Sequence, residues 1–243
     1  MGRESRARHK RRPDPPMEPY GETTRYIVSA PEAIESDPEM ASLIVCVGMA
    51  INALGFQLSS LRHAAARGRT TVYWERDVVL SFATSCAFAY EAVRFTSQNL
   101  AKLRPLANLS GCPADVMANI GKICGGAHPA WPLMTTNRNQ LTFHWDPQAI
   151  MPTVRAFARN KRIVWIEGSQ PEQGDGSIHR LALAVLNHAF NGSSDLATPD
   201  EVRQRVSEAR DLVIDLMKTL IGFLTHCTDG YLQSINAKAL SAR

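Results

Sequence analysis

The feature that most constrains the fold is a long apolar stripe near the C-terminus, whose members recur at alternating intervals of four and three residues. That spacing places them along one side of an α-helix. The run Thr198-Pro199-Asp200-Glu201 precedes the stripe and matches a capping box with proline at the first helical position. We therefore predict a helix that begins at this box and ends at Gly230. The stripe consists of Val202, Val206, Ala209, Val213, Leu216, Leu220, Phe223 and Cys227.

Three earlier segments carry a similar helical periodicity. The first, residues 38–66, has Asp37 as its N-terminal cap and proline at the first helical position. The second covers residues 72–103, and a turn at residues 108–113 separates it from a shorter helix over residues 113–123. In the first segment, apolar residues step by three and four, which predicts a second buried stripe. That stripe consists of Ile44, Val47, Ile51, Leu54, Leu58 and Leu61.

Signals for β-strands are few. We expect residues 25–29 and residues 162–167 each to form one short extended piece, and the glycines predict a loop at residues 168–177. A further helix is expected over residues 178–189. Long amphipathic helices with short connections predict an all-α fold, an antiparallel helical bundle.

Charge is distributed unevenly along the chain. The 243 residues carry a formal net charge of +4, but residues 1–12 hold six basic residues and one acidic residue, a net +5, which leaves −1 for the remainder. Prolines follow this basic start. We therefore predict a disordered basic and proline-rich arm over residues 1–37 and a nearly neutral helical-bundle domain over residues 38–243. Met1 and Met17 both fit as the first residue, and the sequence does not choose between them.

Cysteine usage and hydropathy predict a cytoplasmic protein. The five cysteines are odd in number and widely spaced, which favours reduced core residues over disulfides or zinc ligands. No secretion signal is expected, because no apolar segment follows the basic start closely. The most apolar run, residues 41–56, is shorter than the ~20 residues that a membrane span needs. We expect it to be a buried helix of the bundle, with no contact to a membrane.

The residues that carry chemistry lie in the run Arg138-Asn139-Gln140-Leu141-Thr142-Phe143-His144. A histidine, with a reference pKa of ~6.5, can take up and release protons near neutral pH. An arginine keeps its charge, and its planar guanidinium group can hold two phosphate oxygens. Asn139 could anchor the same phosphate or orient the arginine. Together these residue types suit the needs of RNA cleavage through the 2′-hydroxyl, which requires no metal ion or other cofactor.

The same run resembles the Arg-x(4–6)-His signature of the HEPN superfamily, and the following Phe143-His144-Trp145-Asp146-Pro147 is similar to its abortive-infection-associated branch. The resemblance implies a helical bundle with metal-independent endoribonuclease activity. It also implies an RNA substrate, a homodimer that joins two copies of the motif, and a role in toxin–antitoxin systems or anti-phage defence with a possible antitoxin partner. Some family members carry a modified tyrosine two positions after the histidine. Asp146 stands there instead, so that regulation is not implied.

The motif also has structural explanations. Residues six apart on a regular helix point ~120° apart, so Arg138 and His144 would share a face only through a bend or a curled side chain. His144 could fill the edge of a core beside Phe143 and Trp145, and Arg138 could form an ordinary ion pair with Asp146.

Three functional classes therefore stay open from the sequence. The first is the endoribonuclease, with Arg138, Asn139 and His144 as its catalytic residues. The second is a catalytically inactive HEPN-like module that binds RNA, a nucleotide or a protein partner, and the third is a purely structural helical dimer. A metal site is a weaker hypothesis, because no two candidate histidines have the spacing of helical metal ligands. Its candidate ligands are His128, His144, Asp146, His179 and His188.

Overall fold

The computed structural model describes residues 25–27, 34, 37–66, 74–136, 199–235 and 238–240. These residues form an all-α structure with one short pair of strands, which confirms the predicted class. Its helices are α2 (Pro38–Ala66), α3 (Trp74–Leu109), α4 (Ala114–Cys124), α5 (Trp131–Thr136) and α8 (Pro199–Ser234). The expected helix at residues 178–189 and the extended piece at residues 162–167 lie outside the described part of the chain.

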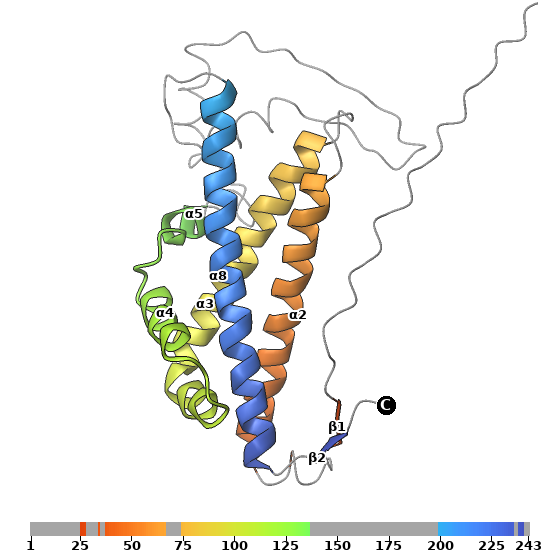
Figure 1. The fold of residues 1–243 in the computed structure, drawn as a ribbon, viewed down its shortest axis with the longest axis vertical. Helices are drawn as coiled ribbons and strands as arrows, with labels where there is room; N and C mark the ends of the chain where they lie inside the picture. The colour runs from red at the N-terminus through yellow and green to blue at the C-terminus, as the bar shows by residue number, and fades with distance from the viewer. Residues whose placement is uncertain are drawn as a thin grey trace, which may run out of the picture.

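The three long helices α2, α3 and α8 pack along one another, and α4 and α5 lie on the side of α8 away from α2 (Figure 1). Helix α2 runs opposite to the other two. Helices α3 and α8 run in the same direction, so the antiparallel arrangement predicted for the bundle holds for α2 only. The core lies between these three helices and extends under α4 and α5, where Ile120, Ile123 and Met134 are buried.

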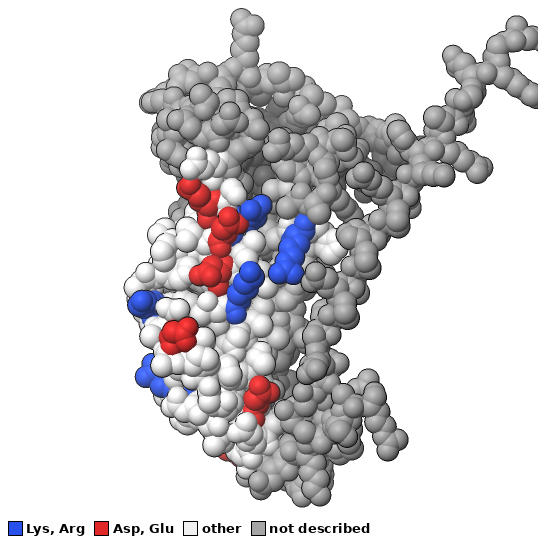
Figure 2. Space-filling model, viewed as in Figure 1, with Lys and Arg blue, Asp and Glu red and all other residues white. Residues whose placement is uncertain are grey.

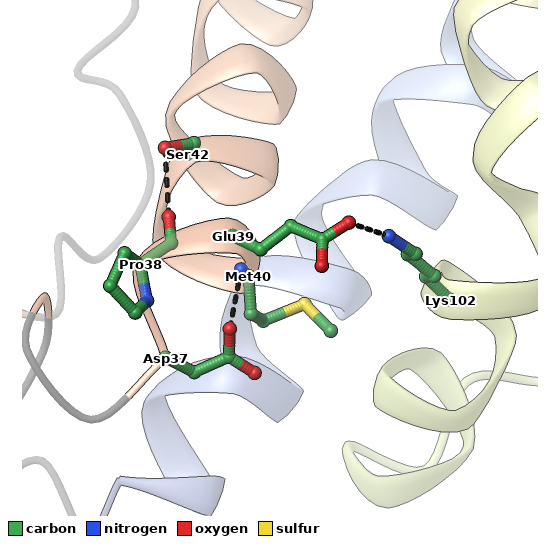
Figure 3. A network of polar contacts seen from close by, with 6 residues as sticks. All are labelled: Asp37, Pro38, Glu39, Met40, Ser42 and Lys102. Carbon is green, nitrogen blue, oxygen red and sulfur yellow. Dashed lines mark hydrogen bonds and ion pairs between the residues drawn. The ribbon is translucent and has the colours of Figure 1, made fainter.

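Helix α2 begins where the sequence predicts, and the cap can be followed atom by atom (Figure 3). Asp37 Oδ1 accepts a hydrogen bond from the backbone N–H of Met40 at 2.9 Å. The Ser42 hydroxyl donates to the Pro38 carbonyl at 2.8 Å, and Glu39 forms an ion pair with Lys102 near the end of α3. The cap satisfies one of the backbone donors that the first turn leaves unpaired. The Glu39–Lys102 ion pair joins the start of α2 to α3 near its end.

The buried side of α2 differs from the predicted stripe by a small rotation. Val47, Leu54 and Leu61 are buried as expected, whereas Ile44, Ile51 and Leu58 are only partly buried. The side facing α3 and α8 is completed by the buried Leu43, Gln57 and Ala64. A search for large apolar residues misses this side, because a small residue and an amide occupy some of its positions.

Only one side of α2 is buried. The opposite side exposes the large apolar side chains Val45, Met49 and Phe56, so the prediction of a buried bundle helix is right for half of its surface. Within the described residues, Pro38–Ala64 is also the one helical stretch long and apolar enough to cross a membrane, by length and composition alone.

Gln57 belongs to a polar group inside the α2–α3 contact. Its Oε1 lies 3.3 Å from the hydroxyls of both Thr84 and Ser85 on α3. The Ser85 hydroxyl also lies 2.6 Å from the Ser81 carbonyl oxygen. Gln57 and Ser85 are buried, so these contacts offset the loss of hydration. They fix the position of α2 along α3, because sliding either helix along its axis would leave the Gln57 side-chain oxygen unpaired.

Helix α3 continues six residues beyond its predicted end at residue 103, through Pro105 to Leu109. Proline lacks the N–H that would bond the carbonyl four residues earlier. Both Pro105 and Ala101 are exposed, so water can bond that carbonyl and the helix continues. The turn predicted at residues 108–113 follows. Gly111 adopts a φ of +73°, and the N–H of Cys112 donates to the Ala107 carbonyl at 2.9 Å.

Helix α8 begins at Pro199, as predicted, but does not end at Gly230. Gly230 is buried inside the helix, where α8 crosses α3. A Cβ atom on this residue would collide with the Leu106 carbonyl oxygen and come within 2.6 Å of its carbonyl carbon. One turn earlier, the Cys227 thiol donates to the Leu103 carbonyl at 3.5 Å. Gly230 therefore serves a close approach of two backbones and not the end of a helix.

The two strands join distant parts of the chain. Strand β1 (Arg25–Ile27) pairs antiparallel with β2 (Lys238–Leu240), with Tyr26 opposite Ala239. Strand β1 lies inside the arm predicted as disordered over residues 1–37, at the extended piece expected from the sequence. The rest of that arm lies outside the described residues, apart from Ile34 and Asp37.

We predict that Gly230→Ala lowers the free energy of unfolding by about 1–3 kcal/mol, because the new methyl group must push α8 away from α3. Gly222→Ala is the matched control on the same helix, since nothing lies within 4 Å of a Cβ there. It should be neutral or stabilising by up to about 1 kcal/mol, through helix propensity. Urea unfolding followed by circular dichroism measures both. Equal effects of the two substitutions would contradict the close crossing.

We predict that Thr96→Val raises the free energy of unfolding by about 1 kcal/mol. Within the described part of the chain, the buried Thr96 hydroxyl has no hydrogen-bond partner, and valine has nearly the same shape. Ser85→Ala removes an equally buried hydroxyl that is hydrogen-bonded, so it should lower the same quantity by about 1 kcal/mol. Opposite signs in urea unfolding are the expected result, and a loss for Thr96→Val would show that this hydroxyl is paired.

Candidate functional site

The predicted catalytic residues Arg138, Asn139 and His144 lie outside the described residues, as does Asp146. The structure describes the segment that leads to them. Helix α5 begins at Trp131, one residue before the expected start at Pro132. The prediction of a helix onset at this point is confirmed, and its continuation to residue 144 stays a prediction.

Helix α5 is held firmly against α3. The ring of Trp131 stacks on that of Tyr90, with centroids 5.5 Å apart and an interplanar angle of 27°. Ala130 and Met134 are both fully buried. Stacked aromatic rings and buried apolar groups fix the direction in which the chain leaves this helix. Any site formed just after residue 136 therefore starts from a well-anchored base.

A second polar site lies within the described residues, beside α5. Its centre is His128, in the connection between α4 and α5, whose side chain is 14% exposed. The backbone N–H of Ala130 donates to His128 Nδ1 at 3.1 Å. His128 Nε2 lies 4.0 Å from Asp215 Oδ2 on α8, which is too far for a direct hydrogen bond but suits an ion pair or a bridging water.

These contacts define the protonation of His128. Because Nδ1 accepts a hydrogen bond, the neutral ring must carry its proton on Nε2, the nitrogen that faces Asp215. Burial lowers the pKa of His128 below its usual value, and the nearby Asp215 carboxylate opposes that effect in part. Protonation at Nδ1 would also remove the acceptor for the Ala130 N–H. The histidine is therefore neutral near pH 7.

A cavity of about 110 Å³ adjoins this histidine. Helix α4 contributes Asn119 and Lys122 to its lining, and α8 contributes Asp215 and Thr219. The cavity is large enough for water or a very small polar group. The side chains around it can donate from an amide, an ammonium group and the His128 Nε2–H, and accept at the Asp215 carboxylate.

The described residues around this cavity contain no cluster of metal ligands. No group of three potential metal ligands occurs within the described residues, so His128 has no partners there for the metal site considered from the sequence.

Burial raises the pKa of Cys86 and of Cys227 to about 12, so both thiols stay protonated. These two cysteines are core residues, as predicted. Cys46 is exposed on α2, so the core prediction is wrong for that residue.

A larger and more open groove of about 450 Å³ lies along α3, beside the proline at position 105. Among the described residues, Arg104 is its one charged lining residue, and the others are Leu100, Ala101, Pro105 and Asn108. An arginine without a neighbouring acid–base group can bind an anion but cannot transfer protons. The described lining of the groove therefore contains no catalytic set.

Charges on the described surface are mixed. On the face drawn in Figure 2, basic and acidic side chains are interspersed, without a large patch of one sign among the described residues. This agrees with the nearly neutral domain expected from the sequence. Attraction of a polyanion to this face would be weak.

Sequence analysis missed the side chains that surround His128. Asn119 and Lys122 are three residues apart on α4, and Asp215 and Thr219 are four apart on α8. Each pair thus shares one helix side, which is a detectable pattern. What the sequence does not show is that these two sides face each other.

No family model, curated protein or solved structure matches the chain. The HEPN resemblance therefore rests on residues 138–147 and on the helical class.

We predict that the wild-type protein loses more stability than His128→Asn when the pH is lowered from 7.5 to 5.5. A pKa lowered by folding means that the unfolded chain binds a proton more readily, so protonation favours unfolding as the pH falls through and below the unfolded value of ~6.5. Asparagine can still accept the Ala130 N–H but cannot titrate. The urea midpoints of both proteins at the two pH values measure the loss of stability. An identical pH dependence of the two proteins would contradict the lowered pKa of His128.

Proposed function

We propose that this chain is a metal-independent endoribonuclease of the HEPN type, with Arg138, Asn139 and His144 as its catalytic residues. The observation that carries the proposal is the Arg138–His144 run, which directly follows α5 in a chain whose described residues are all-α. The helical class is what the resemblance requires. The anchoring of α5 by Trp131 and Met134 gives the run a fixed starting point.

The chemistry of RNA cleavage fits these residue types. A base removes the proton from a ribose 2′-hydroxyl, the 2′-oxygen bonds to phosphorus, and the bond from phosphorus to the 5′-oxygen breaks. An acid protonates that leaving oxygen, so the products are a 2′,3′-cyclic phosphate and a 5′-hydroxyl end. Histidine can serve as the base or the acid, and arginine can stabilise the charge on the phosphate oxygens. Asn139 supports the phosphate or the arginine.

A single copy of the run supplies one histidine, whereas the reaction uses both a base and an acid. Two copies related by a two-fold axis would place two His144 side chains and two Arg138 side chains at one cleft. The proposed enzyme is therefore a homodimer.

His128 does not replace His144 in this role. His128 Nδ1 is occupied by the Ala130 N–H, and Nε2 faces a carboxylate. A phosphate near Nε2 would also approach Asp215, which repels it. Catalysis at the motif is thus the stronger proposal.

A biological setting follows from the same resemblance. We infer that the protein acts in the cytoplasm as the toxin of a toxin–antitoxin pair or in anti-phage defence, where an antitoxin protein would restrain it. The basic residues 1–12 would add nonspecific attraction to RNA phosphates. The second candidate is a catalytically inactive HEPN-like module that binds RNA, a nucleotide or a protein partner through the same cleft.

We predict that the purified full-length protein cleaves single-stranded RNA in the presence of excess EDTA and leaves cyclic phosphate ends. His144→Ala should lower the rate by about 10²–10⁴-fold, as expected for loss of a general acid or base. Arg138→Ala should lower it by about 10²–10³-fold, through loss of charge stabilisation in the transition state.

His128→Asn is the matched control, because it removes a histidine outside the motif and should cleave at the wild-type rate. Equal helicity of all variants by circular dichroism excludes unfolding as the cause. Cleavage that is equal in every variant would indicate a contaminant. RNA binding without cleavage, lost in Arg138→Ala, would favour the binding module.

A further inference from the structure

The outward side of α2 carries a second row of residues at heptad spacing. Its members are all exposed, and they are Val45, Met49, Asn52, Phe56 and Ser59, which we term the α2 seam. The three large apolar members are 64%, 66% and 68% exposed. Intervals of four, three, four and three residues are those by which one helix packs along another. The α2 seam lies opposite the side that faces α3 and α8, so the described bundle does not use it.

The surroundings of the α2 seam suit a close helix–helix contact. No charged residue occurs between residues 40 and 61, a length of about 30 Å at ~1.5 Å per residue. Small residues flank the row, with Gly48 and Gly55 on one side and Cys46 and Ala53 on the other. Nothing lies within 4 Å of a Cβ at either glycine, so a second backbone has room to approach.

We propose that the α2 seam pairs with the same seam of a second copy of this chain, in antiparallel orientation about a two-fold axis beside Asn52. In this register Met49 meets Phe56 of the second copy, and Val45 meets Ser59. Thioether–aromatic contacts are favourable. The two Asn52 side chains meet at the axis, where paired amides satisfy each other and fix the register.

The charges at the two ends of α2 select the antiparallel orientation. The first turn follows the cap Asp37 and carries Glu39, whose charge Lys102 of α3 balances, so Asp37 keeps this end acidic, and the last turns carry Arg62. Antiparallel pairing places the acidic end of each helix beside the basic end of the other, whereas parallel pairing would place Arg62 beside Arg62. Antiparallel helix dipoles also attract each other.

A second copy fits the α2 seam better than a lipid bilayer does. Helix α2 packs against both α3 and α8, so insertion of α2 would carry their charged surfaces with it. Glu91 and Arg94 on α3 and Asp215 and Lys218 on α8 are exposed. Surface-bound helices usually flank their apolar side with basic residues, and the flanks of the α2 seam are uncharged.

This inference concerns the surface of association and does not depend on catalysis by the motif. A dimer through the α2 seam could exist without ribonuclease activity, and cleavage could occur in a dimer formed elsewhere. The α2-seam dimer and the ribonuclease activity can therefore each be refuted without refuting the other.

The first test is sedimentation equilibrium of the full-length protein at micromolar concentration. The wild type should be a dimer, and Phe56→Glu should weaken dimerisation by at least about 100-fold, because the pairing would bury two unpaired carboxylates. Phe88→Glu is the matched control, since Phe88 is an exposed aromatic residue of α3 at 41%. It should leave the dimer unchanged. Circular dichroism checks that all three proteins are folded.

The second test locates the axis by disulfide cross-linking. All variants carry Cys46→Ser, because that thiol is exposed on α2. Asn52→Cys alone should form a covalent dimer on mild oxidation. Val45→Cys should cross-link efficiently only when mixed with Ser59→Cys, and cross-linking of Val45→Cys to itself would show a parallel pair and overturn the orientation.

Other outcomes would overturn the proposal. A monomeric wild type that floats with vesicles of phosphatidylcholine and phosphatidylglycerol, and loses this in Phe56→Glu, would assign the α2 seam to a membrane. A monomer that ignores vesicles would mean that other residues of the same chain cover the seam. A dimer unaffected by Phe56→Glu would place the contact elsewhere.

Discussion

The crossing of α3 and α8 near their C-terminal ends is the contact on which the described fold depends. At Gly230 the two backbones approach so closely that no side chain fits between them, and the thiol of Cys227 bonds the Leu103 carbonyl one turn away. Because α3 and α8 run in the same direction, the part of the chain that links the end of α3 to the start of α8 must return along the bundle. Helices α4 and α5 begin that return on the side away from α2 (Figure 1).

Helix α2 satisfies two different requirements with its two sides. The side toward α3 and α8 buries apolar surface and includes Gln57, whose side-chain oxygen is paired with α3 hydroxyls. This polar contact fixes the position of α2 on α3. The other side, the α2 seam, keeps its large apolar groups in water. Leaving such groups exposed along a whole helix forgoes about 1.5–3 kcal/mol for each large side chain that could be buried. Association through this side would recover that free energy without changing the bundle.

The sequence predicted those features that depend on neighbours along the chain. The cap at Asp37, the start of α8 at Pro199 and the helix onset near Pro132 follow from local hydrogen bonding and backbone restriction, and all three are confirmed. Features that depend on distant residues were missed. Gly230 has the pattern of a helix end, yet it serves a contact with Leu106, more than a hundred residues away. Pro105 stays within α3 because its side of the helix faces solvent. The polar surroundings of His128 come from two helices whose relative rotation no local pattern encodes.

The chain has two candidate sites, the described one at His128 and the predicted one at the Arg138–His144 run. The cavity between α4 and α8 offers His128, a neutral histidine whose Nδ1 accepts the Ala130 N–H and whose Nε2 faces Asp215, in a space too small for a nucleotide. Such a site stabilises the connection between α4 and α5 more readily than it catalyses a reaction. Reaction chemistry on RNA needs a histidine that can transfer a proton beside a cation that can hold phosphate, and the Arg138–His144 run places both residue types close together in the sequence. A domain with a nearly neutral surface gains little from long-range attraction, so recognition of RNA would depend on that local pair. A dimer would bring two copies of this pair together only if its interface lies beside the motif, which is why the state of association and the chemistry need separate experiments.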